Sequence, residues 1–460
     1  MLSPGGLHLD VLCRDAFMTT SLDALRRGTL AGARSLKLCC GLDEFPREIF
    51  GLADTLEILD LSGNALTSLP NEMGRLRKLR VLFCSGNAFT RLPPALGDCA
   101  MLSQVGFRAS GLREVPEESL PPALRWLTLT DNRIETLPAS LGERPALQKL
   151  MLSGNRLRQL PDSMAGAAGL ELLRLSANRF ERLPSWLAGL PRLAWLAWAG
   201  NPMDQALPMD QALSAPVGRS IDWSELAMGA LIGEGASGLV HQAYWQPDSE
   251  VAAQPVALKL FKNAMTSDGL PDHEITACLT AGEHPNLMGA LGRLVGHPAG
   301  TDGLLMPLLP EDWRPLAGPP SLETCSRDVY DPGFRLDLSV ILRIAIGIGG
   351  AASHLHDRGL LHGDLYAHNI LWDGAVGESV LSDFGGASFL SSGGGRLAFA
   401  RIETRAWGLL LGELLDRCID TVPGESQLRI LQQQCVQPDA GARPLLAEAL
   451  DILMTIAPGW

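Results

Sequence analysis

The stretch Leu147-Gln-Lys-Leu150-Met-Leu152-Ser-Gly-Asn155-Arg-Leu157-Arg-Gln-Leu160-Pro161 decides the fold of the first half of the chain. The same pattern returns along the sequence at a nearly constant spacing. Its polar position is occupied in turn by Asn64, Asn87, Ser110, Asn132, Asn155, Asn178 and Asn201, in steps of 23, 23, 22, 23, 23 and 23 residues. A fixed period of this length is typical of a solenoid whose units pack on their neighbours.

Each unit predicts one short strand whose alternate leucines point inward, and no unit can bury those leucines alone. We expect the asparagines to be structural, because stacked amides can satisfy backbone groups in the turn after each strand. The pattern resembles the leucine-rich-repeat family over residues 33–202, beginning with a degenerate unit around Leu36 and Leu38. The resemblance implies an α/β solenoid with parallel strands on a concave face.

The second half carries a different set of motifs. Gly233-Glu-Gly235-Ala-Ser-Gly238-Leu-Val240 is glycine-rich, and glycines let a hairpin backbone approach phosphates closely. A Rossmann turn is disfavoured, because alternating polar residues follow where a helix should begin. A strand-like Val256-Ala257-Leu258-Lys259 comes next, and later His362-Gly363-Asp364-Leu365-Tyr366-Ala367-His368-Asn369 precedes Asp383-Phe384-Gly385.

These motifs, in this order, resemble the protein kinase family. The resemblance implies an α+β bilobal domain over residues 220–460 that uses ATP and Mg²⁺. Asp364 would accept the proton of the substrate hydroxyl, while Asn369 and Asp383 would bind the metal. The residues expected around ATP are Gly233, Gly235, Gly238, Val240, Ala257, Lys259, Glu274, Met306 and Leu308.

Lys259 is expected to hold the α and β phosphates and to pair with a helical glutamate. Glu274 is the main candidate for that glutamate, and Glu283 stays open as a competitor because the step from Lys259 to Glu274 is short for the family. Met306 would be the gatekeeper of a hinge that hydrogen-bonds adenine.

The catalytic loop departs from the family pattern at two positions. Gly363 stands where an arginine usually reads a phosphorylated activation loop, so we do not expect activation by that route. Tyr366 stands where a lysine usually steadies the γ-phosphate, and we expect His368 to supply part of that charge. In addition, an Ala-Pro-Glu motif is missing between Gly385 and Glu403.

Three functions follow from these motifs. The first is an active Ser/Thr-type protein kinase whose repeats bind a substrate or a regulator. The second is a phosphotransferase for small molecules, since His-Gly-Asp and a short activation segment also occur in aminoglycoside and choline kinases. The third is a pseudokinase scaffold, a hypothesis weakened by the presence of Lys259, Asp364, Asn369 and Asp383.

The alternation of side chains along the repeat strands places large apolar residues on the concave face. Exposed aromatic side chains are typical of protein contacts. The face therefore predicts a site for a protein substrate or regulator, or for the chain's own kinase domain. Its main residues are Phe83, Trp126, Met151 and Trp195.

The length of 460 residues fits two domains, with a cap at 1–32, repeats at 33–202, a linker at 203–219 and the kinase-like part at 220–460. A net charge of -13 disfavours nucleic acid as a partner. The apolar stretch from Val340 to Ala352 is short and contains Arg343, which favours a buried helix over a membrane span.

Nine cysteines without paired CxxC spacing, together with a start that lacks a secretory signal, predict a cytoplasmic protein. Delivery by a specialised secretion machine stays open. The combination of repeats and kinase motifs resembles bacterial leucine-rich-repeat protein kinases.

Overall fold

The computed structural model describes residues 22–206 and 219–457, apart from 236, 249, 263–264, 267, 391–394 and 420–424. Contacts divide the chain into two compact units that separate between Leu190 and Pro191. The last repeat is therefore grouped with the residues that follow it, whereas the sequence placed the end of the repeats at residue 202. Most of the expected cap (1–32) and linker (203–219) lies outside the described residues.

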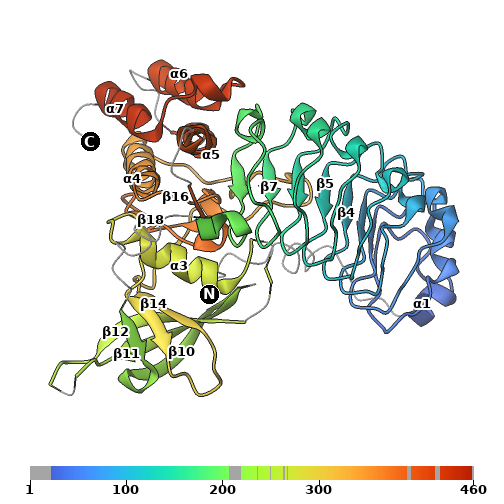
Figure 1. Cartoon of the computed structure of the whole chain (residues 1–460), viewed down its shortest axis with the longest axis horizontal. Helices are drawn as coiled ribbons and strands as arrows, with labels where there is room; N and C mark the ends of the chain where they lie inside the picture. Colours follow the sequence, from blue (N-terminus) through green and yellow to red (C-terminus); the bar gives the residue numbers. More distant parts are fainter. Residues whose placement is uncertain are drawn as a thin grey trace. The chain divides into compact units, whose positions relative to one another are not determined.

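The repeats form a parallel sheet whose strands follow chain order, as Figure 1 shows for the blue to green part of the chain. A short helix, α1 (Leu22–Arg26), comes before the first strand. Each strand has three residues, and its central side chain is buried in the core of the solenoid. The strands are β1 (Ser35–Lys37), β2 (Ile58–Asp60), β3 (Val81–Phe83), β4 (Gln104–Gly106), β5 (Trp126–Thr128), β6 (Lys149–Met151), β7 (Leu172–Arg174) and β8 (Trp195–Ala197).

Short 3-10 helices connect successive strands. Proline precedes six of them, at Pro46, Pro70, Pro93, Pro116, Pro138 and Pro161. Proline suits this place because its ring fixes φ near the helical value and the first turn needs no backbone donor. The 3-10 helices are η1 (Arg47–Leu52), η2 (Asn71–Arg75), η3 (Pro94–Leu96), η4 (Glu117–Ser119), η5 (Ala139–Leu141), η6 (Asp162–Gly166), η7 (Leu187–Gly189) and η8 (Pro202–Ala206).

The repeated asparagines hold the turns after the strands. The amide nitrogen of Asn132 donates to the carbonyl oxygens of Phe107 and Leu129, at 2.8 and 2.9 Å. Its Oδ1 accepts from the backbone nitrogens of Ser110 and Leu112, at 3.1 and 2.9 Å. One side chain thus satisfies backbone groups of two repeats, which confirms the structural role predicted for this position.

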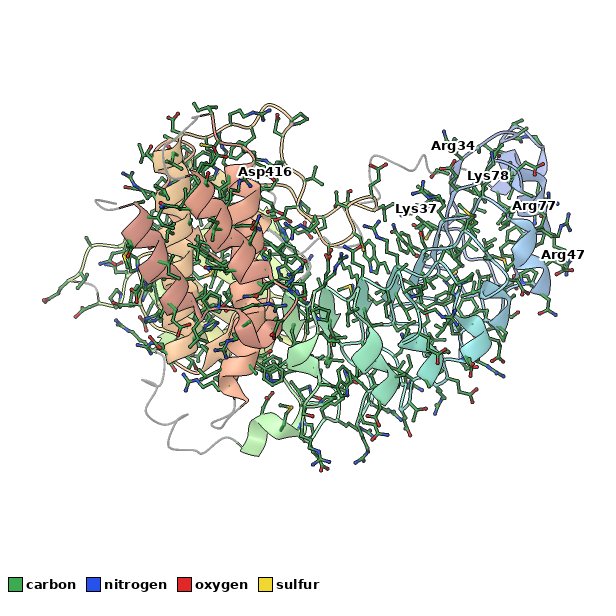
Figure 2. The ribbon with its side chains drawn as sticks, turned by 90° about the horizontal axis from the view of Figure 1, so that it is seen from above. Arg34, Lys37, Arg47, Arg77, Lys78 and Asp416 are labelled. Atoms are coloured by element: carbon green, nitrogen blue, oxygen red, sulfur yellow. The ribbon has the colours of Figure 1, made fainter. Side chains whose placement is uncertain are left out.

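Basic side chains gather on the first repeats, where Figure 2 labels Arg34, Lys37, Arg47, Arg77 and Lys78. Carboxylates compensate three of these charges. Arg34 pairs with Glu57, Lys37 with Asp60 at 3.1 Å, and Arg47 with Glu72 at 3.4 Å. Three of the five labelled charges are therefore paired within the repeats themselves.

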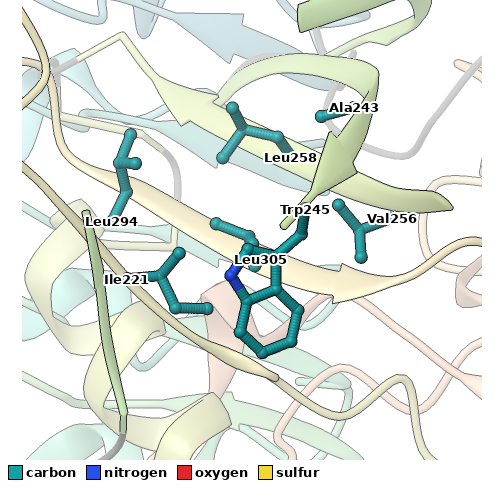
Figure 3. Close-up of a cluster of buried hydrophobic side chains, with 7 residues drawn as sticks. All are labelled: Ile221, Ala243, Trp245, Val256, Leu258, Leu294 and Leu305. Carbon is teal, nitrogen blue, oxygen red and sulfur yellow. The ribbon is translucent and has the colours of Figure 1, made fainter. Parts of the chain in front are cut away.

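The second unit begins with the last repeat and continues with a six-stranded mixed sheet in the order β10-β11-β12-β14-β13-β9. A cluster of apolar side chains fills this sheet's core, as Figure 3 shows for Ile221, Ala243, Trp245, Val256, Leu258, Leu294 and Leu305. The elements of this lobe are β9 (Ser220–Asp222), η9 (Trp223–Glu225), β10 (Leu226–Glu234), β11 (Gly238–Trp245), β12 (Gln254–Phe261), α3 (Pro271–Ala281), β13 (Gly292–Val295) and β14 (Gly303–Pro307).

The rest of the second unit is mainly helical, with α4, α5, α6 and α7 side by side in Figure 1. Short strand pairs between α4 and α5 carry the catalytic-loop motif. The elements are β15 (Arg314–Pro315), α4 (Leu338–Asp357), β16 (Leu360–Leu361), η10 (Ala367–Asn369), β17 (Ile370–Trp372), β18 (Ser379–Leu381), η11 (Phe384–Gly386), β19 (Ser388–Phe389), α5 (Arg396–Leu415), α6 (Glu425–Val436), η12 (Ala440–Ala442) and α7 (Leu446–Ile456).

Helix α4 is long and apolar enough to cross a membrane by length and composition alone. Within the unit it packs against α5, α7 and β18. Its apolar residues from Val340 to Ala352 are largely buried by these contacts. The helix thus has the features of a core helix, as the sequence predicted.

The asparagine ladder generates a stability prediction. Replacing Asn132 with alanine leaves backbone groups of Phe107, Ser110 and Leu112 without their partner, and we expect the free energy of unfolding of the repeats to fall by about 2 to 4 kcal/mol. Urea unfolding followed by circular dichroism measures this loss. Asn132→Ser is the matched control, because Ser110 holds the equivalent position and donates to the Cys84 carbonyl at 3.2 Å. Equal stability of Asn132→Ala and wild type would contradict the structural role.

Candidate active site

A pocket opens between the six-stranded sheet and the helical lobe of the second unit. The glycine-rich turn, strand β12, the segment after β14 and the start of η11 all contribute to its wall. The predicted site residues that line it are Gly233, Gly235, Gly238, Val240, Ala257, Lys259, Glu274, Met306, Leu308, His368 and Asp383. Residues more than one hundred positions apart in the sequence thus meet at one pocket.

Lys259 and Glu274 form an ion pair inside this pocket. Helix α3 carries Glu274, beginning at Pro271 and ending before Gly282, whose φ of 65° is left-handed. Burial alone would lower the pKa of Lys259, but the charges of Glu274 and Asp383 outweigh it and raise that pKa. The ammonium group is therefore charged at neutral pH. Glu283, the competitor for this place, lies beyond the end of α3.

The catalytic-loop motif places Asp364 and Asn369 next to each other. The Asn369 amide nitrogen donates to the Asp364 carbonyl oxygen at 3.0 Å and to its carboxylate Oδ2 at 2.9 Å. The hydroxyl and the backbone nitrogen of Ser382, just before Asp383, both donate to the Asn369 carbonyl at 2.8 Å. These bonds tie the loop to the start of the Asp383 motif.

The carboxylate of Glu403, in helix α5, accepts hydrogen bonds from the backbone of the catalytic loop. Its Oε1 accepts from the Gly363 nitrogen at 2.8 Å, and its Oε2 from the His362 nitrogen at 3.3 Å. The same Oε2 lies 2.8 Å from His356 Nε2. This side chain is 1% exposed, so its carboxylate is committed to these donors and fixes the turn that presents Asp364.

His368 faces the site from the 3-10 helix η10 and is held by Asp328. Its Nδ1 lies 2.7 Å from Asp328 Oδ1, and its backbone nitrogen donates to Oδ2 at 3.1 Å. Burial would lower the pKa of His368, but the charge and hydrogen bond of Asp328, followed by Asp364 and Asp383, outweigh it and raise that pKa. Asp328 could not be predicted from the sequence, because it lies 40 residues before His368 and belongs to no motif.

Asp383 and Asn369 offer the oxygen ligands that Mg²⁺ prefers. Asp383 adopts a left-handed backbone with φ 62° and ψ 86°, and its Oδ1 accepts from the Gly385 nitrogen at 3.1 Å. The two hydrogen bonds of the Asn369 side chain to Asp364 are both donated by its amide nitrogen, so the Oδ1 is the atom that would hold a cation. A carboxylate and an amide oxygen fit a metal that takes its other ligands from phosphates and water.

The four large side chains predicted for the concave face are not exposed, and that expectation was wrong. Phe83, Trp126, Met151 and Trp195 have exposed fractions of 3%, 1%, 2% and 2%. The indole of Trp126 lies 4.1 Å from the Lys149 ammonium and donates to the Thr128 hydroxyl at 2.8 Å. Strand alternation gives the direction of a side chain but not what covers it.

Trp195 is covered by the catalytic loop of its own unit. Its ring stacks on Tyr366 with centroids 4.1 Å apart and an interplanar angle of 8°. Docking onto the chain's own kinase-like part, one of the two predicted alternatives, therefore applies to this residue.

Comparisons with known proteins agree with this geometry. Residues 226–393 match the protein tyrosine and serine/threonine kinase family, and residues 55–76, 122–180 and 145–203 match leucine-rich repeats. The chain joins leucine-rich repeats to a protein kinase domain. The kinase match covers the pocket, the catalytic loop and the Asp383 motif.

Several known proteins are similar to a little over a third of the chain. "Probable serine/threonine-protein kinase gdt4" of Dictyostelium discoideum is 30% identical over 161 residues, which is 35% of this chain and 8% of the relative. "Probable serine/threonine-protein kinase gdt2" of the same organism is 28% identical over 36% of this chain and 9% of the relative. "Tyrosine-protein kinase receptor TYRO3" of Gallus gallus is 28% identical over 38% of this chain and 20% of the relative.

The chain therefore corresponds to a small part of each of these larger proteins. All three come from eukaryotes, so they do not support the bacterial assignment expected from the sequence.

The bonds of Glu403 generate a prediction about pH. Burial acts to raise the pKa of Glu403, but the hydrogen bond and charge of His356 and the Gly363 donor lower it below its ordinary 4.5. A lowered folded pKa stabilises the fold above the unfolded value, and this contribution is lost as pH falls through the folded pKa. We expect Glu403→Gln to be about 1 to 3 kcal/mol less stable than wild type at pH 7, with the gap closing below pH 4.5.

Chemical unfolding at several pH values measures this gap. Glu425→Gln, at the more exposed start of α6, is the matched control and should stay close to wild type at every pH. A gap for Glu403→Gln that is the same at pH 7 and at pH 3 would contradict the prediction.

Proposed function

We propose that this chain is an ATP-dependent protein kinase that transfers the γ-phosphate of ATP to a serine or threonine hydroxyl of a protein. The observation that carries the proposal is the Lys259–Glu274 ion pair, which faces Asp383 in a pocket lined by the glycine-rich turn and the hinge. A charged lysine at this place can hold phosphates, and the glycines let the backbone approach them.

Each site residue has a separate task in this proposal. Lys259 binds the α and β phosphates, and Glu274 keeps its ammonium in place. Asp364 accepts the proton of the attacking hydroxyl, and the Asn369 amide orients its carboxylate. Asp383 and Asn369 would hold Mg²⁺, which neutralises charge on the phosphates.

His368 supplies a further positive charge at the site. Tyr366 occupies the place of the family's lysine, and it is buried under Trp195 rather than directed toward the pocket. The His368 imidazole lines the pocket, and Asp328 favours its protonated form. A cation at this position stabilises the charge that develops on the transferred phosphate.

The comparisons favour a protein substrate over a small molecule, because residues 226–393 match a family of protein kinases. Serine and threonine are proposed because both slime-mould relatives are named as kinases of that type. A scaffold without activity is disfavoured because the lysine, the aspartates and the asparagine of the site are all present and positioned.

The repeats upstream of Pro191 are proposed as the module that recruits a protein substrate or regulator, since repeat solenoids offer an extended surface for such contacts. A cytoplasmic location also stays a proposal, and it is supported by nine cysteines without paired CxxC spacing. The bacterial origin expected from the sequence stays a prediction.

Phosphotransfer is tested directly with the purified full-length chain, radiolabelled ATP, Mg²⁺ and a generic protein acceptor. We expect label on protein that disappears in Asp364→Asn and on removal of Mg²⁺ by a chelator. Asp451→Asn, on the exposed side of α7, is the matched control and should keep its activity. Phosphoamino-acid analysis should find the label on serine or threonine. ATP binding without label on any protein would contradict the proposal.

The role of His368 gives a second prediction. His368→Ala removes a cation from the site, and we expect turnover to fall by about tenfold to a hundredfold. Asp328→Asn should act in the same direction by weakening the support of the imidazolium. His297→Ala, in the loop after β13, controls for loss of a histidine elsewhere. Turnover of His368→Ala near that of wild type would dismiss the role.

A further inference from the structure

The last repeat contacts the catalytic loop through an aromatic stack and a hydrogen bond. Neither contact is needed to cover the apolar core at the end of a solenoid. Besides stacking on Tyr366, Trp195 in β8 donates its indole Nε1–H to the Leu365 carbonyl at 3.0 Å. The guanidinium of Arg327 lies 5.5 Å from the centroid of the same indole ring. Residues 365 and 366 follow Asp364 directly, so the indole contacts the segment that carries the proposed base.

A second tryptophan of the repeat reaches the segment after Asp383. The Trp198 backbone nitrogen donates to the Ser388 hydroxyl at 2.9 Å, and the Trp198 ring lies 5.3 Å from the ring of Phe399. Ser388 belongs to β19, which pairs with β16 just before the catalytic loop. Through Trp198 the repeat thus contacts strand β19 in the segment after Asp383 and helix α5.

Gly363 shows how closely the repeat approaches the loop. A Cβ atom at this position would lie 2.5 Å from the Leu196 carbonyl oxygen and 2.4 Å from that of Gly386. Its φ of 72° is also left-handed, a conformation that glycine adopts without strain. A side chain here would push β8 or η11 away, so the residue before Asp364 is compatible with the docked repeat because it is glycine.

Buried arginines hold the repeat from helix α5 and from the segment before α7. Arg443, which is 1% exposed, donates to the Pro191 carbonyl at 2.8 Å. Arg405 donates to the Arg192 carbonyl at 3.1 Å. On the other side, a Cβ on Gly200 would lie 2.6 Å from the ring of His273, the residue before Glu274 in α3. The repeat therefore contacts elements that carry both halves of the site.

We propose that the last leucine-rich repeat, Pro191–Asp204, is a positioning element of the phosphotransfer site, with Trp195 as its main positioning residue. The proposal rests on the proposed kinase function. The repeat fixes the Asp364 loop through Trp195 and the segment after Asp383 through Trp198. It takes the place of contacts that an activation segment would make, and the site is held in its active arrangement without phosphorylation.

The contacts of the Trp195 indole explain why this residue should contribute most to the position of the Asp364 loop. A stacked aromatic pair and a buried hydrogen bond both disappear when the indole is removed, and both end within two residues of Asp364. Small displacements of a catalytic group lower the rate of the chemical step far more than they weaken ATP binding. The nucleotide pocket is lined by Lys259 and Met306, and Trp195 is not part of that lining.

The test compares full-length Trp195→Ala with full-length Leu172→Ala. Leu172 holds the same register position in β7, is also buried, and belongs to the first unit. We expect Trp195→Ala to lower kcat at least about tenfold with KM for ATP changed by less than about threefold, while Leu172→Ala keeps kcat within about twofold of wild type. Trp195→Phe keeps a stacked ring and loses the donor, so its kcat should lie between those of wild type and Trp195→Ala.

Hydrogen–deuterium exchange tests the same variants without relying on activity. In Trp195→Ala we expect faster amide exchange across 362–369 and 386–389 and unchanged exchange across the strands β10 to β12. If wild-type protein shows no phosphotransfer, the proposed kinase function is wrong. The exchange measurement would then test by itself whether Trp195 positions the loop. Unchanged exchange in the loop, unchanged kcat, or equal losses in Trp195→Ala and Leu172→Ala would each overturn the proposal.

Discussion

The site depends on how the backbone at Gly363 is enclosed. Its nitrogen donates to the buried Glu403 carboxylate at 2.8 Å, while the carbonyl oxygens of Leu196 and Gly386 occupy the space that a side chain would need. An amide buried in this way must keep its acceptor, because an unpaired buried donor is costly. The turn before Asp364 is consequently fixed from the α5 side by a charge and from the β8 side by close packing.

A second constraint is the balance of charge around the pocket. Two carboxylates, Asp364 and Asp383, lie at one site and would repel each other without cations nearby. Lys259 supplies positive charge beside its buried partner Glu274, and the charge and hydrogen bond of the buried Asp328 raise the pKa of His368 and so favour its protonated form. The arrangement suits a reaction in which negative phosphate oxygens approach these carboxylates. A buried charged side chain without a partner of opposite charge would lower the stability of the fold, so each of these pairs is needed to keep its members charged inside the protein.

The repeats and most of the candidate site residues could be predicted from the sequence, because both depend on patterns within short segments of the chain. The repeat period is visible because each unit contacts the next at a constant distance along the chain, and the kinase motifs are visible because each role needs a fixed residue type. Asp328 could not be found in this way, because its bond to His368 spans 40 residues and follows no motif. The burial of Trp195 was one of two alternatives that the sequence left open, because alternation predicts only that its side chain leaves the solenoid core. The partner that covers it, Tyr366, lies 171 residues later in the sequence.

In the proposed arrangement the last repeat is part of the catalytic structure, and the stack of Trp195 on Tyr366 is the contact that joins the two most directly. A double-mutant cycle measures that contact, using the unfolding free energies of Trp195→Ala, Tyr366→Ala and the double variant in the full-length chain. We expect a favourable coupling of about 0.5 to 1.5 kcal/mol between the two side chains, as is usual for stacked aromatic pairs. Additive losses with no coupling would contradict it, because the two rings would then contribute to stability independently.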